Sequence, residues 1–396
     1  MKKNTIIILA STFPRWKDDS VPRFVYDHAI NMKSYFSKVI VIAPHYKNAK
    51  RKEKMEGIEV LRFMYFFPLS KQTIAYGKYK ESSGFLSYIK AIIYVLVQLI
   101  YTLYVTIQYK ADVINAHWMI PQGFSASIVG ILTRKKVIVN IHGGDVFTLN
   151  HRIFMLFKKF VLSQASEVIV NSSVTKKAAR KILDRKFLVI PEVVDVENFS
   201  QAFMLKNYRN YNKFIVLFVG RLSEEKGVIY LLEAIKLLVE RNNLSLQLLI
   251  VGDGPEREKL EGFVFKNNIR KYVEFSGWKQ REALVDIFRA ANVFVGPSIK
   301  AKDGWVEAFG IVFAEASASG LPVITTDTGG MVDIIIDNET GFIIPEKSPA
   351  IIAEKIGILY HDSDLCHKFG EQGHKRAITE YSRETIKDMY KKLFYS

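Results

Sequence analysis

The stretch Glu307-Ala-Phe-Gly-Ile-Val-Phe-Ala-Glu315 determines how this chain is interpreted: two carboxylates are separated by seven residues. The first glutamate precedes a Phe-Gly turn, and the second lies in an Ala-rich segment, 312–320, that is expected to be helical. Upstream, Gly220-Arg-Leu-Ser-Glu-Glu-Lys-Gly227 follows an apolar run and places two cations between glycines. The backbone amides of a helix start are thus expected to lie between two hydrogen-bond acceptors, with fixed positive charge supplied by a separate loop.

This combination is suited to a nucleotide sugar. A diphosphate is attracted to helix N-terminal amides and to cations, while carboxylates accept hydrogen bonds from sugar hydroxyls. Arg221 can contact two phosphate oxygens at once, and Lys226 acts as a point charge. The other residues predicted to bind the donor are Gly252, Glu307, Phe309, Gly310, Ile311 and Glu315, of which 309–311 would use their backbone N–H groups.

Five motifs occur in the order found in the family 4 glycosyltransferases, which the chain therefore resembles. They are Gly220-Arg-Leu-x-x-x-Lys-Gly227, Val251-Gly-Asp-Gly-Pro255, the Glu-x7-Glu element, Ala318-x-Gly-x-Pro-Val-Ile324, and Gly329-Gly330 followed by Thr340-Gly-Phe342. These motifs cover residues 214 to about 345. The N-terminal half matches more loosely, through Ala116-His-Trp118 and His142-Gly-Gly-Asp145.

The resemblance implies a retaining enzyme of the GT-B fold and gives individual residues roles. Arg221 and Lys226 would stabilise the diphosphate, Glu307 would contact the donor sugar's hydroxyls, and Glu315 would accept from the ribose hydroxyls. His142 would lie near the C6 hydroxyl of the reacting sugar and orient it. We therefore expect His142 and Glu307 to be the catalytic residues.

The acceptor is expected to contact a second group of residues. Asp145 would hold either the loop that follows His142 or the acceptor itself, and His117-Trp118 offers an aromatic platform for a sugar ring. After the first strand, relatives carry a glycine pair where this chain has Thr12-Phe-Pro-Arg-Trp16, so Arg15 and Trp16 are interpreted as acceptor or membrane contacts. A further departure, Pro191-Glu-Val-Val-Asp195, is interpreted as affecting the linker and not the chemistry.

Two other site chemistries are less favoured. A hydrolytic carboxylate pair would need Glu307 and Glu315 close together, but on a continuous helix they would be roughly 12 Å apart. Neither His117 nor His142 has Cys or carboxylate neighbours at metal-ligand spacing. We expect no metal and no cofactor, with the nucleotide sugar as co-substrate.

Short β-branched runs alternate with helical patterns, which predicts an α/β fold of two doubly wound, parallel-sheet (Rossmann-like) domains. The GT-B resemblance implies that they face each other across a cleft. Residues 1–195 would form the acceptor-binding domain and residues 196–379 the donor-binding domain, with the boundary within 191–211. The last helix, within about 380–396, is expected to pack back on the N-terminal domain.

Charge is distributed unevenly. Residues 1–195 hold 30 Lys and Arg against 13 Asp and Glu, whereas residues 196–396 hold 26 against 27. A one-sided basic surface indicates an anionic partner. The basic clusters match no zinc-finger, RRM or helix-turn-helix pattern, so a membrane surface is favoured over nucleic acid; a simple contribution to solubility stays open.

The segment 85–108 is apolar nearly all round, except for a narrow stripe formed by Lys90, Gln98, Thr102 and Thr106. Such a helix is either buried or lipid-facing. A core or domain-surface helix, peripheral docking on a membrane and a true span are all compatible with the pattern, and a span is disfavoured because a strand begins at Asp112. The single cysteine, Cys366, excludes an internal disulfide and agrees with a reducing compartment. The apolar run 6–10 is too short for a signal peptide.

The sequence thus predicts a cytoplasmic, membrane-peripheral, retaining glycosyltransferase. It would move a hexose from a nucleotide diphosphate sugar to a lipid-linked saccharide during cell-surface polysaccharide biosynthesis. One alternative is a soluble GT-B transferase with a small phosphorylated acceptor. Another is a nucleotide-sugar-binding assembly subunit without turnover.

Overall fold

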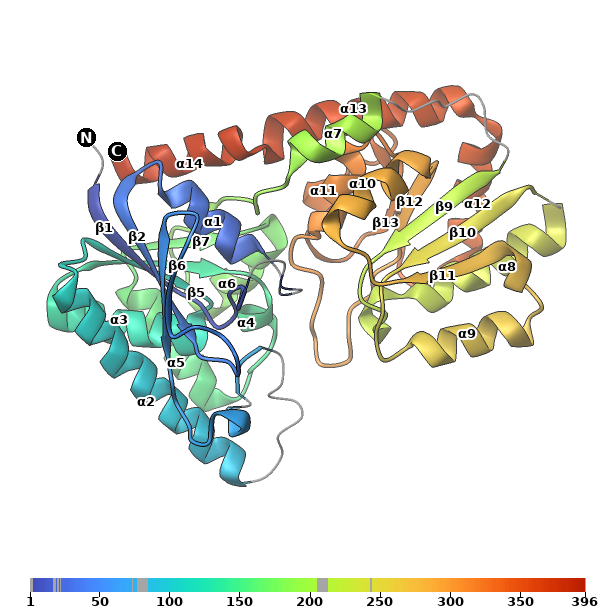
Figure 1. Ribbon diagram of the computed structural model, residues 1–396. Helices are drawn as coiled ribbons and strands as arrows, with labels where there is room; N and C mark the ends of the chain where they lie inside the picture. The colour runs from blue at the N-terminus through green and yellow to red at the C-terminus, as the bar shows by residue number, and fades with distance from the viewer. Residues whose placement is uncertain are drawn as a thin grey trace. The chain divides into compact units, whose positions relative to one another are not determined.

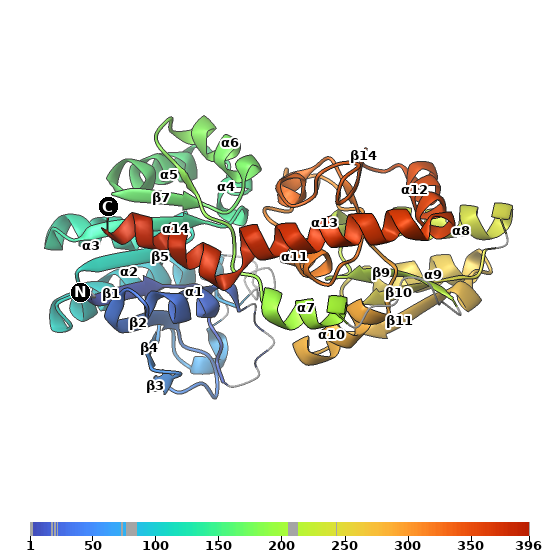
Figure 2. The ribbon, with the colours of Figure 1, turned by 90° about the horizontal axis from the view of Figure 1, so that it is seen from above.

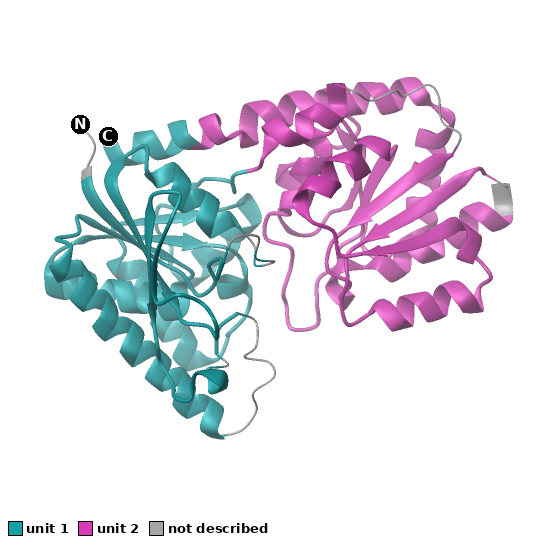
Figure 3. Cartoon of the chain, viewed as in Figure 1, with its two compact units in different colours: residues 1–193, 387–396 teal, residues 194–386 magenta. Residues whose placement is uncertain are grey.

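A computed structural model describes residues 3–16, 19, 21, 23–72, 74–76, 85–204, 213–242 and 244–395. The chain divides into two compact units, one formed by residues 1–193 with 387–396 and the other by residues 194–386 (Figure 3). The boundary at 193/194 lies two residues before the predicted one. Of the predicted linker segment 191–211, residues 205–211 lie outside the described part of the chain.

In the first unit, eight strands among the described residues form one sheet in the order β3-β4-β2-β1-β5-β6-β7-β8 (Figure 1). Their bounds are β1 Lys3–Leu9, β2 Phe36–Pro44, β3 Lys52–Met55, β4 Ile58–Phe63, β5 Val113–His117, β6 Lys136–Ile141, β7 Glu167–Val170 and β8 Leu188–Val189. β1 is central and pairs in parallel with β2 and β5. Its Ile6, Ile7 and Ile8 are fully buried, as expected for a strand covered on both faces.

One strand of this sheet was missed by the sequence analysis, and the sheet is not wholly parallel. β3 pairs antiparallel with β4 at the sheet edge, through a two-residue turn in which Glu56 and Gly57 both have positive φ. The segment Lys52-Glu-Lys-Met55 is charged and mostly exposed, so it lacks the apolar alternation on which strand prediction depends. Charged residues of this kind are typical of an edge strand, where they discourage pairing with other chains.

Helices of the first unit bury the core of this sheet. They are α1 Phe24–Met32, α2 Phe85–Gln108, α3 Phe124–Thr133, α4 Gly144–Phe147, α5 Arg152–Gln164 and α6 Ser173–Ile182. Residues from α2, α3, α5 and α6 pack against alternate strand residues such as Ile7, Ile40 and Ile114. From the other end of the chain, α14 Arg383–Tyr395 contributes Tyr390 and Phe394, whose rings lie against those of His28, Tyr35 and Phe36 in this unit.

In the second unit, six strands among the described residues form a wholly parallel sheet in the order β11-β10-β9-β12-β13-β14. The strands are β9 Phe214–Val219, β10 Leu246–Val251, β11 Val273–Gly277, β12 Val293–Gly296, β13 Val323–Thr326 and β14 Gly341–Ile344. The helices are α7 Val196–Met204, α8 Val228–Asn242, α9 Arg257–Lys266, α10 Arg281–Ala290, α11 Ile311–Ala318, α12 Pro349–His361 and α13 Ser363–Tyr381. The parallel pairing of all six strands agrees with the alternation of β-branched runs and helical patterns in the sequence.

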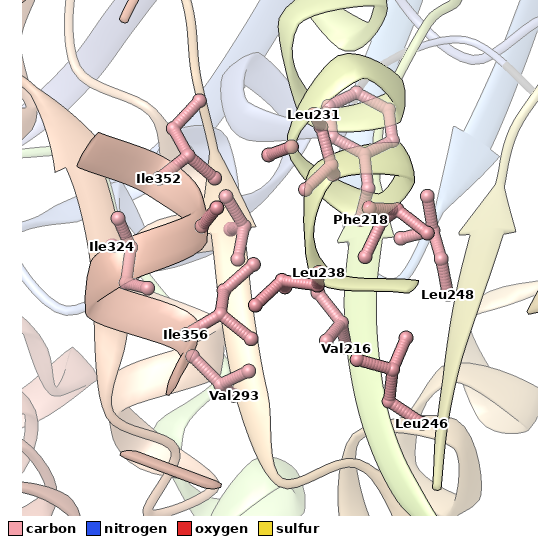
Figure 4. Close-up of a cluster of buried hydrophobic side chains, with 14 of the residues drawn as sticks. Val216, Phe218, Leu231, Leu238, Leu246, Leu248, Val293, Ile324, Ile352 and Ile356 are labelled. Atoms are coloured by element: carbon pink, nitrogen blue, oxygen red, sulfur yellow. The ribbon is translucent and has the colours of Figure 1, made fainter. Parts of the chain in front are cut away.

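Two apolar clusters cover the two faces of this second sheet. One joins α8, α9 and α12 to strand residues such as Val216, Leu248 and Ile324 (Figure 4). The other joins α10, α11 and the C-terminal part of α13 to Leu217 and Val323 on the opposite face. Seen from above in Figure 2, α8 and α9 lie on the side of the sheet away from α11 and α13. The fold is therefore a pair of doubly wound α/β units, as the sequence predicts.

Candidate active site

The donor motifs of the second unit gather at the carboxyl edge of its sheet. β9 neighbours both β10 and β12, so the strand order reverses there, and the loops after β9 and β12 leave the sheet on either side of that reversal. Ligands of open α/β sheets bind at such switch points. The loop after β9 is 220–227, and the loop after β12 is 297–310, which leads into α11.

Lys226 and Glu307 meet across this switch point. The Lys226 ammonium donates to the Glu307 carboxylate, and both side chains are largely buried. The ammonium also lies 5.7 Å from the centre of the Trp305 ring. The two residues that the sequence assigned to phosphate and to sugar therefore lie together, although 81 positions separate them in the chain.

Glycines allow the neighbouring loops to approach closely. Gly227 has φ +65°, and a Cβ there would lie 2.0 Å from the Pro297 carbonyl oxygen. Gly252 has φ +133°, and a Cβ there would lie 1.9 Å from the Gly220 carbonyl oxygen. The amide of Gly252 donates to the Gly277 carbonyl, so this residue shapes the loop and its own N–H is already used.

The first turn of α11 supplies the predicted amides. Gly310 precedes the helix with φ +85°, and Ile311 is its first residue. The Glu307 carbonyl accepts from the Gly330 amide at 2.8 Å, which ties the turn before α11 to the Gly329-Gly330 loop. Phe309 is buried with its ring against Tyr381, so only its backbone is available to a ligand.

Glu315 lies one turn into α11 and is buried. Its Oε1 is 3.5 Å from a terminal nitrogen of Arg281, whose Nε lies 3.4 Å from Asp195 Oδ2. Burial raises the pKa of Glu315 to about 7; the Arg281 charge opposes this increase and Asp195 adds to it. The sequence analysis missed Arg281 and Asp195, because neither belongs to a motif that marks it for this site.

The sequence argument against a hydrolytic carboxylate pair took residues 307–315 as one continuous helix, which the structure does not show. Residues 307–310 form a non-helical turn, and α11 starts at Ile311. The estimate of roughly 12 Å for a continuous helix therefore does not apply to Glu307 and Glu315. The carboxylates differ instead in their partners, since Glu307 pairs with Lys226 and Glu315 with Arg281.

Arg221 is exposed and forms no side-chain hydrogen bond or ion pair with any residue that the structure describes. It follows Gly220, whose amide is held by the Val251 carbonyl at 2.9 Å. The backbone beside Arg221 is therefore held in place, and its guanidinium is free to contact an anion.

In the first unit, His142 forms the centre of a hydrogen-bonded chain at the carboxyl edge of the sheet. Its Nδ1 lies 2.7 Å from Glu192 Oε1, and its Nε2 lies 2.8 Å from Nδ1 of His117. Because a carboxylate only accepts, Nδ1 of His142 donates to Glu192, and the contact between Nε2 of His142 and Nδ1 of His117 needs a proton on one of these two nitrogens. Both ring nitrogens of His142 are thus engaged within the protein, which fixes the orientation of the imidazole. Residues 191–195, interpreted from the sequence as affecting only the linker, include Glu192, which contacts the predicted catalytic His142.

His28 extends this group, with its ring centre 4.6 Å from that of His117. Burial lowers the pKa of His28 to about 3, with a smaller effect of the same direction from His142 and an opposing one from Glu192. Burial likewise lowers the pKa of His117 well below its ordinary value. For Glu192, burial acts to raise the pKa, but the charge and hydrogen bond of His142 lower it below its ordinary value.

Asp145 is buried and holds the loop that follows His142. Oδ2 accepts from the Met119 amide at 2.9 Å, and Oδ1 accepts from the amides of Gly143 at 3.1 Å and His142 at 3.3 Å. Burial raises the pKa of Asp145, while His142 and these amides oppose the increase. Of the two roles considered for Asp145, the contacts assign it to the loop.

Trp118 has φ +76°, and its amide donates to the Asn140 carbonyl. Its ring lies 5.3 Å from the His142 ring and 5.7 Å from the Phe24 ring, centre to centre. Trp118 thus lies beside His142 and Phe24, which the sequence analysis missed, whereas His117 is 1% exposed and offers no surface to a sugar ring, so its predicted part in the platform is wrong.

Arg15 is already paired in this unit. Its guanidinium donates through two nitrogens to Asp19, at 2.7 and 2.6 Å, and lies 4.4 Å from the Tyr46 ring centre. Trp16 lies next to it and is 43% exposed. Trp16 thus keeps a surface that a ligand can contact, whereas Arg15 is used mainly to hold the loop.

No group of three or more His, Cys, Asp or Glu side chains is arranged to hold a metal ion in the part of the chain that the structure describes.

Comparisons with known proteins agree with this geometry. Residues 200–376 match the family described as Glycosyl transferases group 1, and residues 21–198 match Glycosyltransferase Family 4. An uncharacterized glycosyltransferase of Methanocaldococcus jannaschii is 31% identical over 267 residues, 66% of this chain and 69% of the relative. The capsular polysaccharide biosynthesis glycosyltransferase CapM of Staphylococcus aureus is 26% identical, over 67% of this chain and 71% of its own length.

A third relative is the GDP-mannose-dependent alpha-(1-6)-phosphatidylinositol monomannoside mannosyltransferase of Mycobacterium tuberculosis. It is 30% identical over 50% of this chain and 52% of its own. Among solved structures, a sucrose-phosphate synthase of Thermosynechococcus elongatus aligns with a TM-score of 0.77 and 22% identity, over 99% of this chain and 100% of that chain. Anabaena HepE in complex with UDP-glucose aligns with a TM-score of 0.71 and 18% identity, over 99% and 100%.

The fold and the donor motifs define a GT-B glycosyltransferase. The chain belongs to the family 4 glycosyltransferases and is a transferase enzyme.

Proposed function

We propose that this enzyme transfers a hexose, with retention of anomeric configuration, from a nucleotide diphosphate sugar to a lipid-linked saccharide. The reaction would take place at the cytoplasmic face of the cell membrane and serve cell-surface polysaccharide biosynthesis. The observation that carries the donor assignment is the contact between Lys226 and Glu307 beside the N-terminus of α11. This contact supports the assignment because a cation suits phosphate, a carboxylate suits sugar hydroxyls, and the pair lies at a switch point.

Each part of the donor would contact different residues of this site. The diphosphate lies against Lys226, Arg221 and the first amides of α11, while Glu307 releases Lys226 to accept from the sugar hydroxyls. Glu315, one turn further along α11, accepts from the ribose. UDP-glucose in the HepE complex and GDP-mannose in the name of the mycobacterial relative support a nucleotide diphosphate sugar as donor class.

In the proposed reaction, the bond between the anomeric carbon and the phosphate oxygen breaks as the acceptor hydroxyl forms its bond on the same face. The proton of that hydroxyl passes to the leaving phosphate oxygen, so no protein base is needed. Lys226, Arg221 and the helix amides stabilise the charge that develops on the leaving group. We propose that these groups replace a metal ion in this role.

The acceptor would lie against the first unit. His142, Trp118 and Trp16 offer a ring-stacking and orienting surface, and the Glu192–His142–His117 chain fixes the imidazole orientation. The polysaccharide and phosphatidylinositol mannoside named for two relatives support a saccharide acceptor carried by a lipid.

The test has two parts. A thermal-shift panel of UDP-, GDP- and ADP-sugars, with Arg221→Ala as control, is expected to show one nucleotide series raising the Tm and the variant losing that shift. At 100 times its dissociation constant, a donor adds about 2.7 kcal/mol of apparent stability. The product linkage is then read by NMR with a lipid-linked acceptor. An inverted linkage would overturn the retaining assignment, and turnover only with a small phosphorylated acceptor would overturn the lipid-linked one.

A further inference from the structure

α2 is oriented with its polar stripe towards the protein. Lys90, Gln98, Thr102 and Thr106 are all buried. Gln98 accepts from the Ser125 hydroxyl at 3.2 Å, and the Lys90 ammonium lies 5.1 Å from the Phe66 ring centre. The side of the helix that a soluble protein exposes to water is thus the side that packs on the domain.

The outward side of α2 is apolar instead. Six large side chains spaced by three or four residues are each more than half exposed: Tyr88, Ile92, Leu96, Ile100, Tyr104 and Ile107. This spacing puts them on one face of the helix. Among the described helices, α2 is also the one long and apolar enough to cross a membrane by length and composition, and only 28% of its most apolar window is buried.

The exposed apolar residues continue onto neighbouring helices. α3 packs against both α2 and α5, and these helices share one side of the first unit (Figure 1). α3 exposes Ile131 and Leu132, and α5 exposes Ile153, Leu156 and Phe157. Scattered exposed apolar residues need no explanation, but a face built from three adjacent helices indicates an interaction surface. We call these eleven residues the apolar face.

The charges around the apolar face are of one sign. Residues 85–164 contain eight Lys and Arg, no Glu, and only Asp112 and Asp145. Asp145 is buried, and Asp112 accepts from the Thr5 amide at 2.9 Å. Exposed cations on these helices and their ends are Lys110, Arg134, Arg152 and Lys159.

This charge pattern decides between two possible occupants. In a symmetric pair of this chain, the same patch would face itself, and its cations would meet other cations, with no exposed acid among residues 85–164 to neutralise them. An anionic lipid surface complements both the apolar side chains and the surrounding cations. A true span is excluded by the chain itself, since β5 begins at Val113 and pairs with β1 and β6.

We propose that the apolar face of α2, α3 and α5 docks on the surface of an anionic lipid bilayer, with α2 lying in the interfacial plane. This deepens the proposed function, because a lipid-linked acceptor lies in the same bilayer. The surface is separate from the residues that hold the donor.

The test is co-sedimentation of the purified full chain with vesicles. Vesicles of phosphatidylcholine containing phosphatidylglycerol are compared with vesicles of phosphatidylcholine alone, at low and high salt. The variant Ile92→Glu/Ile100→Glu places two charges on the apolar face, and Phe265→Glu is the matched control, because Phe265 is 76% exposed on α9 of the other unit. We expect the double variant to lose about tenfold or more in partitioning, with Tm and donor-induced thermal shift unchanged.

Binding of the wild type and of Phe265→Glu to anionic vesicles, lost in the double variant and weakened by salt, would support the proposal. A wild type that stays in the supernatant at low salt would overturn it, as would a double variant that sediments like the wild type. A wild-type dimer that the double variant makes monomeric, without vesicle binding, would show that a second copy covers the face. Transfer of the sugar to a soluble acceptor analogue tests the proposed function separately. If the enzyme catalyses this transfer but does not bind vesicles, the docking proposal is wrong and the proposed transferase activity is not affected.

Discussion

Glu315 is expected to destabilise the donor-free enzyme at neutral and higher pH. The carboxyl is buried on α11, and burial raises its pKa to about 7 from an ordinary value of 4.5. Arg281 lies 3.5 Å away but is shared with Asp195, so its charge offsets only part of the desolvation. Replacing Glu315 with Gln keeps the shape of the side chain and removes the buried charge, so Glu315→Gln should stabilise the protein.

The magnitude follows from the two pKa values. A factor of ten in proton affinity is worth about 1.4 kcal/mol, so a rise from 4.5 to about 7 corresponds to about 3 kcal/mol. The folded state binds this proton more tightly than the unfolded state does. The contribution is therefore fully present below pH 4.5 and is lost as pH rises towards about 7. Glu315→Gln should exceed the wild type in stability by up to about 3 kcal/mol above pH 7, and the difference should vanish near pH 4.5.

The assay is urea unfolding of wild type and Glu315→Gln at a series of pH values, with the difference between the two taken at each pH. Taking the difference removes the contribution of His28, whose lowered pKa makes stability fall as pH decreases below the ordinary histidine value. The same variant should bind the nucleotide sugar more weakly, since an amide cannot accept from two ribose hydroxyls as a carboxylate does. A variant that is less stable than the wild type above pH 7, or a difference that does not change with pH, would refute the reasoning.

Three further outcomes are expected. Lys226→Ala should weaken donor binding by about 10- to 100-fold, the worth of a hydrogen bond to a charged group, whereas Lys302→Ala, 91% exposed at its side chain on the loop after β12, should bind normally in the same titration. Glu192→Ala should lower kcat by about 100-fold through misorientation of His142 without changing donor affinity; Glu192→Gln, which can still accept from the imidazole, should recover most of the rate, and equal loss in both variants would mean that the charge matters more than the orientation. Treatment with a chelator should leave the transfer rate unchanged, and a loss restored by Mg²⁺ or Mn²⁺ would contradict the metal-independent mechanism.

The parallel core of both sheets could be predicted because its signal is local. Runs such as Phe214 to Val219 and Val137 to Val139 are continuous and apolar, as expected for strands covered on both faces. β3 could not be predicted, because a charged edge strand acquires its structure from its partner β4 and from the turn at Glu56-Gly57. The start of α11 was predicted one residue late. The Phe-Gly turn located it approximately, and the left-handed conformation of Gly310, which caps the helix, places its first residue at Ile311.

The residues predicted to bind the donor were identified because they lie in motifs of fixed spacing, but the partners of those residues in the structure lie outside these motifs. Arg281 begins α10 and Asp195 precedes α7, and only the folded unit brings them to Glu315. Glu192 likewise lies 50 residues from His142 and follows an unremarkable strand. Burial makes the largest contribution to the raised pKa of Glu315 and these partners modify it, so the electrostatics of the site depend on residues that no local pattern identifies.

α2 shows the limit of a periodicity argument most clearly. The sequence contains a narrow polar stripe on an otherwise apolar helix, and the pattern is the same whichever side faces the protein. Only the burial of the stripe residues, together with the hydrogen bond between Gln98 and Ser125, establishes that its polar side is inward. Once that direction is known, the same apolar residues that would have formed a core become an exposed surface next to cations without exposed acids. Of the interpretations left open for residues 85–108, a helix buried all round is therefore excluded by orientation alone, and the exposed apolar side is the basis for the proposed docking on a bilayer.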